Sequence, residues 1–109
     1  MSNAFRPTGN SVVLAVTSAG VSAQVTNVTQ ASEYMLTNTA TSDIIWVAIG
    51  FGSAPTVTIP TSGTPGNAFP ILHQQPPVVI AATADAYFAA KVSGGGTHNL
   101  VITPGEAVK

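Results

Sequence analysis

The chain has 109 residues, no cysteine and a formal net charge of −1, with only three basic and four acidic side chains. An ordinary soluble domain has about a quarter of its residues charged, so this chain is unusually poor in ions. The missing cysteines exclude a disulfide framework and thiolate metal sites, and three dispersed cations are too few to neutralise a nucleic-acid backbone.

The length predicts one domain, and the start of the chain has no apolar run like that of a signal peptide. No segment reaches the roughly 20 apolar residues that a membrane-spanning helix needs. We therefore expect a soluble protein, synthesised in the cytoplasm, with no membrane partner. Residues 1–10 are polar and contain Pro7 and Gly9, which predicts a flexible N-terminal arm before a β-domain at residues 11–109.

The first predicted strand covers residues 11–17, which are mostly apolar and β-branched. A second run alternates from Val21 to Thr26, and Ser18, Ala19 and Gly20 separate the two. The pattern predicts a hairpin at this point.

Residues 33–51 form the most informative stretch. Tyr34 and Leu36 alternate with polar or flexible neighbours, as in a half-buried strand, whereas residues 44–51 are apolar on both sides. The polar loop between them contains Asn38 and Asp43, which favours either a hairpin or an arch between two packed sheets. Trp46, the only tryptophan, is expected at the centre of the fold.

The remaining predicted strands are short. Residues 56–59 lie between Pro55 and Pro60, which predicts an edge strand, and residues 60–67 read as an exposed loop. Strands follow at residues 69–72 and 78–80. The alanines of residues 81–91 favour a helix, but no polar face recurs at helical spacing, so we expect a turn near Asp85 and then a strand. A terminal hairpin joins residues 87–92 to residues 98–103 through a glycine loop, with Pro104 and Gly105 as its end.

About eight short strands, separated by Gly- and Pro-containing turns, predict an all-β protein. An antiparallel two-sheet β-sandwich of jelly-roll or immunoglobulin-like kind is the favoured architecture, and a closed barrel is the second.

No constellation of residues predicts catalysis, a cofactor or a metal site. The titratable side chains do not pair at a recognisable spacing, and the histidines would need a distant carboxylate as third zinc ligand, so two solvated histidines are favoured. Gly50, Gly52 and the glycines of residues 94–96 are better read as a strand end and a turn than as anion-binding loops. The titratable residues considered are Glu33, Asp43, His73, Asp85, His98 and Glu106.

The aromatic side chains Tyr34, Trp46, Tyr87 and Phe88 have two possible uses. They could form a carbohydrate platform, but each lies in an apolar strand with few polar neighbours, which favours core packing.

The neutral surface has a physical consequence for partners. Near-neutral surfaces associate readily, and uncharged Thr, Ser, Asn and Gln can be buried with few ions to desolvate. We expect much of this surface to lie against other proteins; the alternative is a neutral monomer.

Four motifs then occur in order: Trp-Val-Ala-Ile-Gly-Phe-Gly at residues 46–52, Phe-Pro-Ile-Leu at 69–72, Tyr-Phe-Ala-Ala-Lys-Val at 87–92, and Asn-Leu-Val-Ile-Thr-Pro-Gly-Glu at 99–106. Across residues 33–107 the chain resembles small virion proteins of tailed bacteriophages, and the closing residues 101–106 are the most specific element. The resemblance implies a capsid decoration or cement protein with a β-sandwich fold, and it carries over no catalytic residue.

The resemblance and the composition together predict a non-enzymatic structural protein of the virion that binds between major capsid protein subunits as a symmetric homo-oligomer. The arm at residues 1–10 and the loop at residues 60–67 are the hypothetical docking elements. The alternative function is a head-fibre or tail-associated domain that recognises host surface glycans, and a small enzyme is the third class.

Overall fold

The computed structural model describes residues 4–7, 11–24, 33–82 and 86–108. These residues form nine strands and no helix. The strands are β1 (Ala4–Pro7), β2 (Val12–Val16), β3 (Val21–Gln24), β4 (Glu33–Asn38), β5 (Ile45–Phe51), β6 (Phe69–Ile71), β7 (Val78–Ala81), β8 (Ala86–Lys91) and β9 (His98–Val108).

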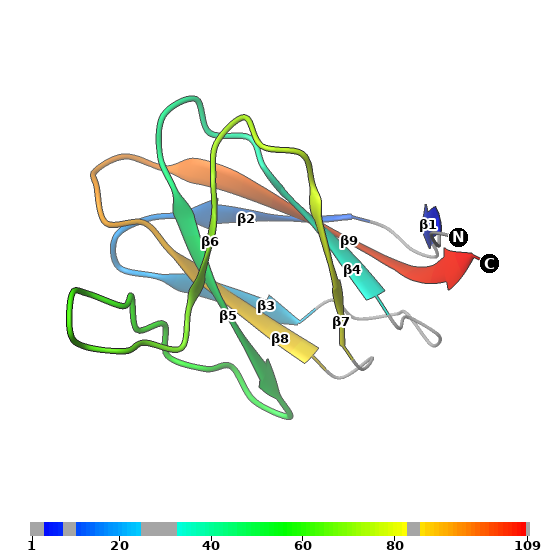
Figure 1. Ribbon diagram of the computed structural model, residues 1–109, viewed down its shortest axis with the longest axis horizontal. Coiled ribbons are helices and arrows are strands. Elements are labelled where there is room, and N and C mark those ends of the chain that lie inside the picture. The colour runs from blue at the N-terminus through cyan, green and yellow to red at the C-terminus, as the bar shows by residue number, and fades with distance from the viewer. Residues whose placement is uncertain (1–3, 8–10, 25–32, 83–85, 109) are drawn as a thin grey trace.

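The strands form two antiparallel sheets (Figure 1). Sheet A has the order β2-β9-β4-β7, and β1 pairs with the far end of β9, Ala4 opposite Val108 and Pro7 opposite Gly105. Sheet B has the order β3-β8-β5-β6. The prediction of an all-β, two-sheet sandwich is therefore confirmed.

The connectivity is that of a jelly roll. The first four strands after β1 pair with the last four in reverse order, as β2 with β9, β3 with β8, β4 with β7 and β5 with β6. The chain is thus one long antiparallel ribbon, and the pairs β4·β9 and β5·β8 close the rolled ribbon into two sheets. Of the two sandwich families expected, this pairing selects the jelly roll.

Two predicted hairpins are wrong. The strands β2 and β3 lie in different sheets, and so do β8 and β9, so each turn is an arch that crosses between the sheets. An alternating pattern identifies a strand and its buried face, but it does not identify the strand's partner. The turn between β4 and β5 is likewise an arch, which is one of the two alternatives that its sequence left open.

The core lies between the sheets and contains the inward residues of both. At its centre Tyr34 and Phe88 pack edge to face, with ring centroids 4.9 Å apart and planes at 61°. Trp46 was expected in this place, and that prediction is wrong: it is only half-buried. Because its neighbours Ile45 and Val47 point into the core, the alternation of β5 turns Trp46 to the outer face of sheet B.

Two further predictions on strands are corrected. Residues 56–59 form no strand; the amide of Asn67 instead accepts from Thr58 N and donates to Thr56 O, both at 2.8 Å. The final strand does not end at Pro104 and Gly105 but continues to Val108. Pro104 is tolerated because it lies between the stretches of β9 that pair with β2 and with β1, where neither strand supplies a partner.

The N-terminal arm is partly built into the fold. Of residues 1–10, Ala4–Pro7 form β1 and are tied to sheet A, so this part of the predicted arm is an edge strand. The other residues of the arm, and the turn expected near Asp85, lie outside the described residues.

Candidate interaction surface

The outer face of sheet A is a surface with few charged groups that spans four strands. In β2, β4 and β9 the buried residues alternate with residues that point away from sheet B. We call these outward residues the sheet A face: Val13, Ala15, Glu33, Met35, Thr37, Val79, Ala81, Asn99, Val101 and Thr103.

The side chains of this face are small, apolar or hydroxylated. Val13 is 58% exposed and Val79 is 42% exposed, although both are large hydrophobic residues. Between them the register sets Val101 beside Val13 and Thr37, and Met35 beside Thr103 and Val79. The face thus has apolar groups at both edges, and apolar and hydroxyl groups side by side at its centre.

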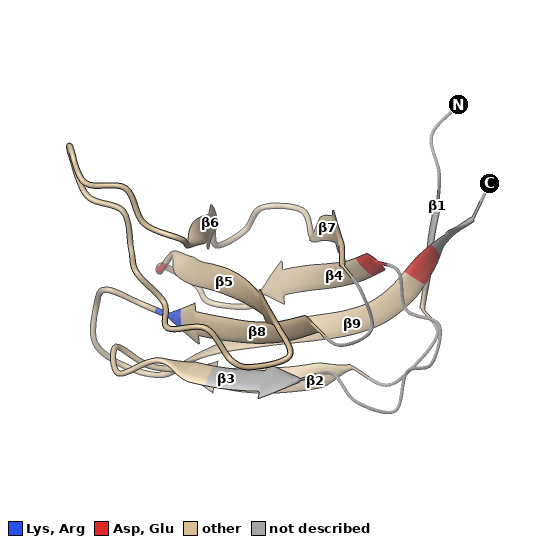
Figure 2. Cartoon of the chain, turned by 90° about the horizontal axis from the view of Figure 1, so that it is seen from below, with Lys and Arg blue, Asp and Glu red and all other residues tan. Residues whose placement is uncertain are grey.

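Charge is placed at the margins of the molecule (Figure 2). Four charged side chains are described: Glu33 is the first residue of β4, Asp43 lies in the β4–β5 arch, Lys91 is the last residue of β8, and Glu106 lies near the end of β9. Only Glu33 belongs to the sheet A face. A partner that covers this face therefore has one carboxylate to desolvate at its rim.

The outer face of sheet B differs, because the chain's own β5–β6 loop lies over it. Ala48 and Ala89 are 1% and 2% exposed although they point away from the core. The loop turns back sharply at Gly50, where a Cβ atom would lie 2.7 Å from Ser53 O and 2.9 Å from Pro55 Cδ. A side chain at this position would push the loop off the sheet.

The outer part of this loop contains the predicted docking segment, residues 60–67. Thr61 and Thr64 exchange backbone hydrogen bonds of 3.0 and 2.9 Å and form an isolated bridge. Gly66 lies against the returning chain, since a Cβ there would be 2.2 Å from Thr58 O. Residues 61–65 are all exposed, so the segment presents an ordered, uncharged tip.

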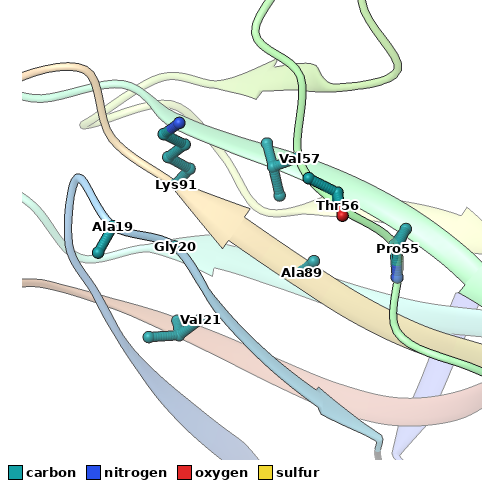
Figure 3. Close-up of a pocket in the computed structure, with 8 residues that line it drawn as sticks. All are labelled: Ala19, Gly20, Val21, Pro55, Thr56, Val57, Ala89 and Lys91. Carbon is teal, nitrogen blue, oxygen red and sulfur yellow. The ribbon is translucent and has the colours of Figure 1, made fainter.

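A shallow pocket of about 250 Å³ lies where the loop meets sheet B (Figure 3). Its lining is formed by the β2–β3 arch, the start of the β5–β6 loop, and Ala89 and Lys91 of β8. Lys91 is the only charged residue of the lining. The residues of the lining are mostly small, but the surface that they expose to the pocket is more polar than apolar. Among the described residues of the lining, no pair of groups could act together as acid and base.

Of the titratable residues considered from the sequence, the structure brings one pair together, His98 and Asp43. His98 Nε2 lies 2.5 Å from Asp43 Oδ2 and 3.2 Å from Gly95 O, so one N–H faces two acceptors and links the β4–β5 arch to the β8–β9 loop. The side chains of His98 and Asp43 are 18% and 33% exposed. A partly exposed pair of this kind contributes about 0–1 kcal/mol.

The other candidates lie apart. His73 is in the β6–β7 connection, where its buried Nδ1 has no hydrogen-bond partner, and Glu33 and Glu106 belong to sheet A. Asp85 is outside the described residues. Across the part of the chain that the structure describes, no three His, Asp or Glu side chains gather closely enough to hold a metal ion.

Sequence reasoning missed the contribution of Asn38. This buried amide donates to Asp43 O at 2.9 Å and Ile71 O at 2.7 Å, and it accepts from Ala40 N at 2.8 Å. It therefore holds the β4–β5 arch and β6 together. The available signal was an Asn at the end of an alternating strand, where the sequence indicated only a turn.

Comparison of the chain with family models, curated proteins and solved structures gives no match. The described residues contain no helix with the length and hydropathy needed to cross a bilayer. The class that the structure itself defines is a small jelly-roll protein with one covered and one open sheet face.

Proposed function

We propose that the protein is a non-enzymatic structural component of a phage virion that decorates or cements the capsid by binding between major capsid protein subunits. The observation that carries the proposal is the sheet A face, an ordered and almost ion-free surface in a chain with very few charges. The resemblance of residues 33–107 to small phage virion proteins supplies the class of partner.

The physical argument concerns desolvation. A capsid-binding protein must bury its surface at many identical places on the lattice, and each buried ion without a partner would cost free energy at every copy. Thr and Val side chains can be covered at little cost, and exposed Val13 and Val79 gain from being covered. Jelly rolls are also a fold that viral capsid proteins use.

The ordered tip of the β5–β6 loop is the second docking element of the proposal. It is uncharged and exposed, and it lies at the opposite sheet from the sheet A face. A protein with docking surfaces on two sides can contact two neighbours at once, which is what a cement between subunits requires.

The test of this function is the composition of purified particles of the phage that encodes the chain. Quantitative mass spectrometry should find the protein in a fixed ratio to the major capsid protein, at hundreds of copies per particle. Its absence from the particle, or a few copies confined to one vertex, would refute the capsid role.

A second function is favoured by the position of Trp46. The side chain is partly buried on the outer face of sheet B, and in the register Pro70 lies on one side of it and Lys91 on the other. A partly exposed indole beside a cation could contact a sugar ring, and jelly rolls also occur in lectins. A head-fibre or tail-associated domain that binds host glycans is therefore the alternative.

A glycan array separates the two functions. Specific signal that is lost in Trp46→Ala and kept in Phe51→Ala, an exposed aromatic at the end of β5, would favour the glycan-binding role. No signal with the wild-type protein would count against it.

A further inference from the structure

Within the described residues, the free edge of β2 has none of the features that usually protect an edge strand. Its five residues are Val-Val-Leu-Ala-Val, with no charge, no proline and no glycine. On one side β2 pairs with β9, from Val12 opposite Ile102 to Val16 opposite His98. On the other side no described residue pairs with it. Because only alternate residues of an antiparallel strand bond to a given neighbour, two or three residues of β2 direct their N–H and C=O groups away from β9.

The opposite edge of sheet A is different. It is formed by β7, which has four residues and directly follows Pro76 and Pro77. In sheet B one edge strand, β6, has three residues and contains Pro70, and the other, β3, has four residues. Short strands with prolines are poor templates for strand addition, whereas an apolar strand without charge is a good one.

We propose that β2 pairs with β2 of a second copy of this chain, antiparallel and about a two-fold axis perpendicular to sheet A. Such an axis keeps outward residues on the outer face, so only registers that match like faces are allowed. The register that uses the whole strand sets Leu14 opposite Leu14 of the second copy, Val13 opposite its Ala15, and Val12 opposite its Val16. The strand is therefore complementary to itself in size, face and charge.

Two observations make a second copy the occupant. The first is this self-complementarity, together with the exposure of Val13 and Ala15, which the pairing would bring into contact with each other.

The second observation is the area of the sheet A face, and this part of the argument rests on the proposed function. A four-stranded face is about 19 Å across and about 17 Å along five residues, or about 320 Å². A stable interface needs about 800 Å² from each partner. Pairing through β2 joins two faces into one eight-stranded surface of about 640 Å², which approaches that value.

The first experiment compares two charge substitutions in the full chain by light scattering after size exclusion over a range of concentrations. Val13→Lys and Val79→Lys place the same charge at exposed positions on opposite edges of one face. We expect a wild-type dimer, a dissociation constant raised at least tenfold by Val13→Lys, and little change with Val79→Lys, with melting temperatures within a few degrees of each other. A monomeric wild type, or equal effects of the two substitutions, would overturn the proposal.

The second experiment fixes the register, and the native chain helps because it has no cysteine. A mixture of Val13→Cys and Ala15→Cys proteins should form disulfide-linked heterodimers under mild oxidation, because opposite residues of a strand pair lie within reach of an S–S bond. A mixture of Val79→Cys and Ala15→Cys should not. Equal yields from the two mixtures would exclude the β2 pairing.

The outcome is separable from that of the capsid proposal. Both experiments use the isolated protein, whereas the capsid role is decided by particle composition. A β2-paired dimer that no particle contains would leave the pairing correct and the function wrong, and a monomer found in particles would do the reverse.

Discussion

Replacement of Phe88 by Ala should be among the most damaging single changes to this fold. The ring is fully buried and packs edge to face on Tyr34 at 4.9 Å, so it links the centre of sheet B to the centre of sheet A. Truncation of a buried Phe costs about 3–5 kcal/mol, including the lost ring pair and the cavity. A domain of this size is stable by about 5–15 kcal/mol, so Phe88→Ala removes a large part of the total.

The measurement is urea unfolding followed by circular dichroism and by Trp46 fluorescence. With a slope of about 1.5 kcal/mol per molar urea, a loss of about 4 kcal/mol moves the midpoint down by 2–3 M. Phe51→Ala is the matched control, because Phe51 is 59% exposed at the end of β5 and should cost at most about 1 kcal/mol. If both variants shifted the midpoint equally, the assignment of the core would be wrong.

Three further predictions follow from particular contacts. Asn38→Ala should lower the free energy of unfolding by about 2–4 kcal/mol, because it removes three hydrogen bonds at a buried position. Asn38→Asp should be no better, since a carboxylate cannot donate to Ile71 O. A loss of less than about 0.5 kcal/mol in thermal unfolding would contradict this prediction. Trp46 fluorescence should be quenched by acrylamide in the folded state, because the side chain is only partly buried, and a fully protected indole would place it in the core after all. Gly66→Ala should open the β5–β6 loop and speed its cleavage in limited proteolysis, because the new Cβ would collide with Thr58 O. Gly95→Ala is the control and should leave the cleavage rate of this loop unchanged, because a Cβ at Gly95 has free space. Equal cleavage rates in the two variants would refute the packing of this loop.

The strands were predictable from sequence because alternation records burial directly. Tyr34 and Leu36 were assigned to a buried face, and both are buried. Partners were not predictable, because the same alternation suits a hairpin and an arch. The β2–β3 and β8–β9 connections show this, and only the pairing of distant strands decides between the two.

Two errors concern β5 and the loop that follows it. Trp46 was assigned to the centre of the fold as the only tryptophan, although Ile45 and Val47 on either side already fill the inward positions of β5. Residues 56–59 were assigned to an edge strand between two prolines, but the side chain of Asn67 takes up their backbone groups instead. The alternation of β5 decides the first case, and the hydrogen bonds of Asn67 decide the second. The link between Asp43 and His98 was also beyond sequence reasoning, since 55 residues separate them and spacing gives no sign of their contact.

The central claim is that the sheet A face is buried against capsid subunits, and binding to capsids that lack the protein tests it most directly. Thr37→Lys places a charge in the middle of that face, and Thr97→Lys places the same charge in the exposed β8–β9 loop. We expect cosedimentation to show at least a tenfold loss of capsid affinity for Thr37→Lys and wild-type affinity for Thr97→Lys. Wild-type affinity in both variants would contradict the account.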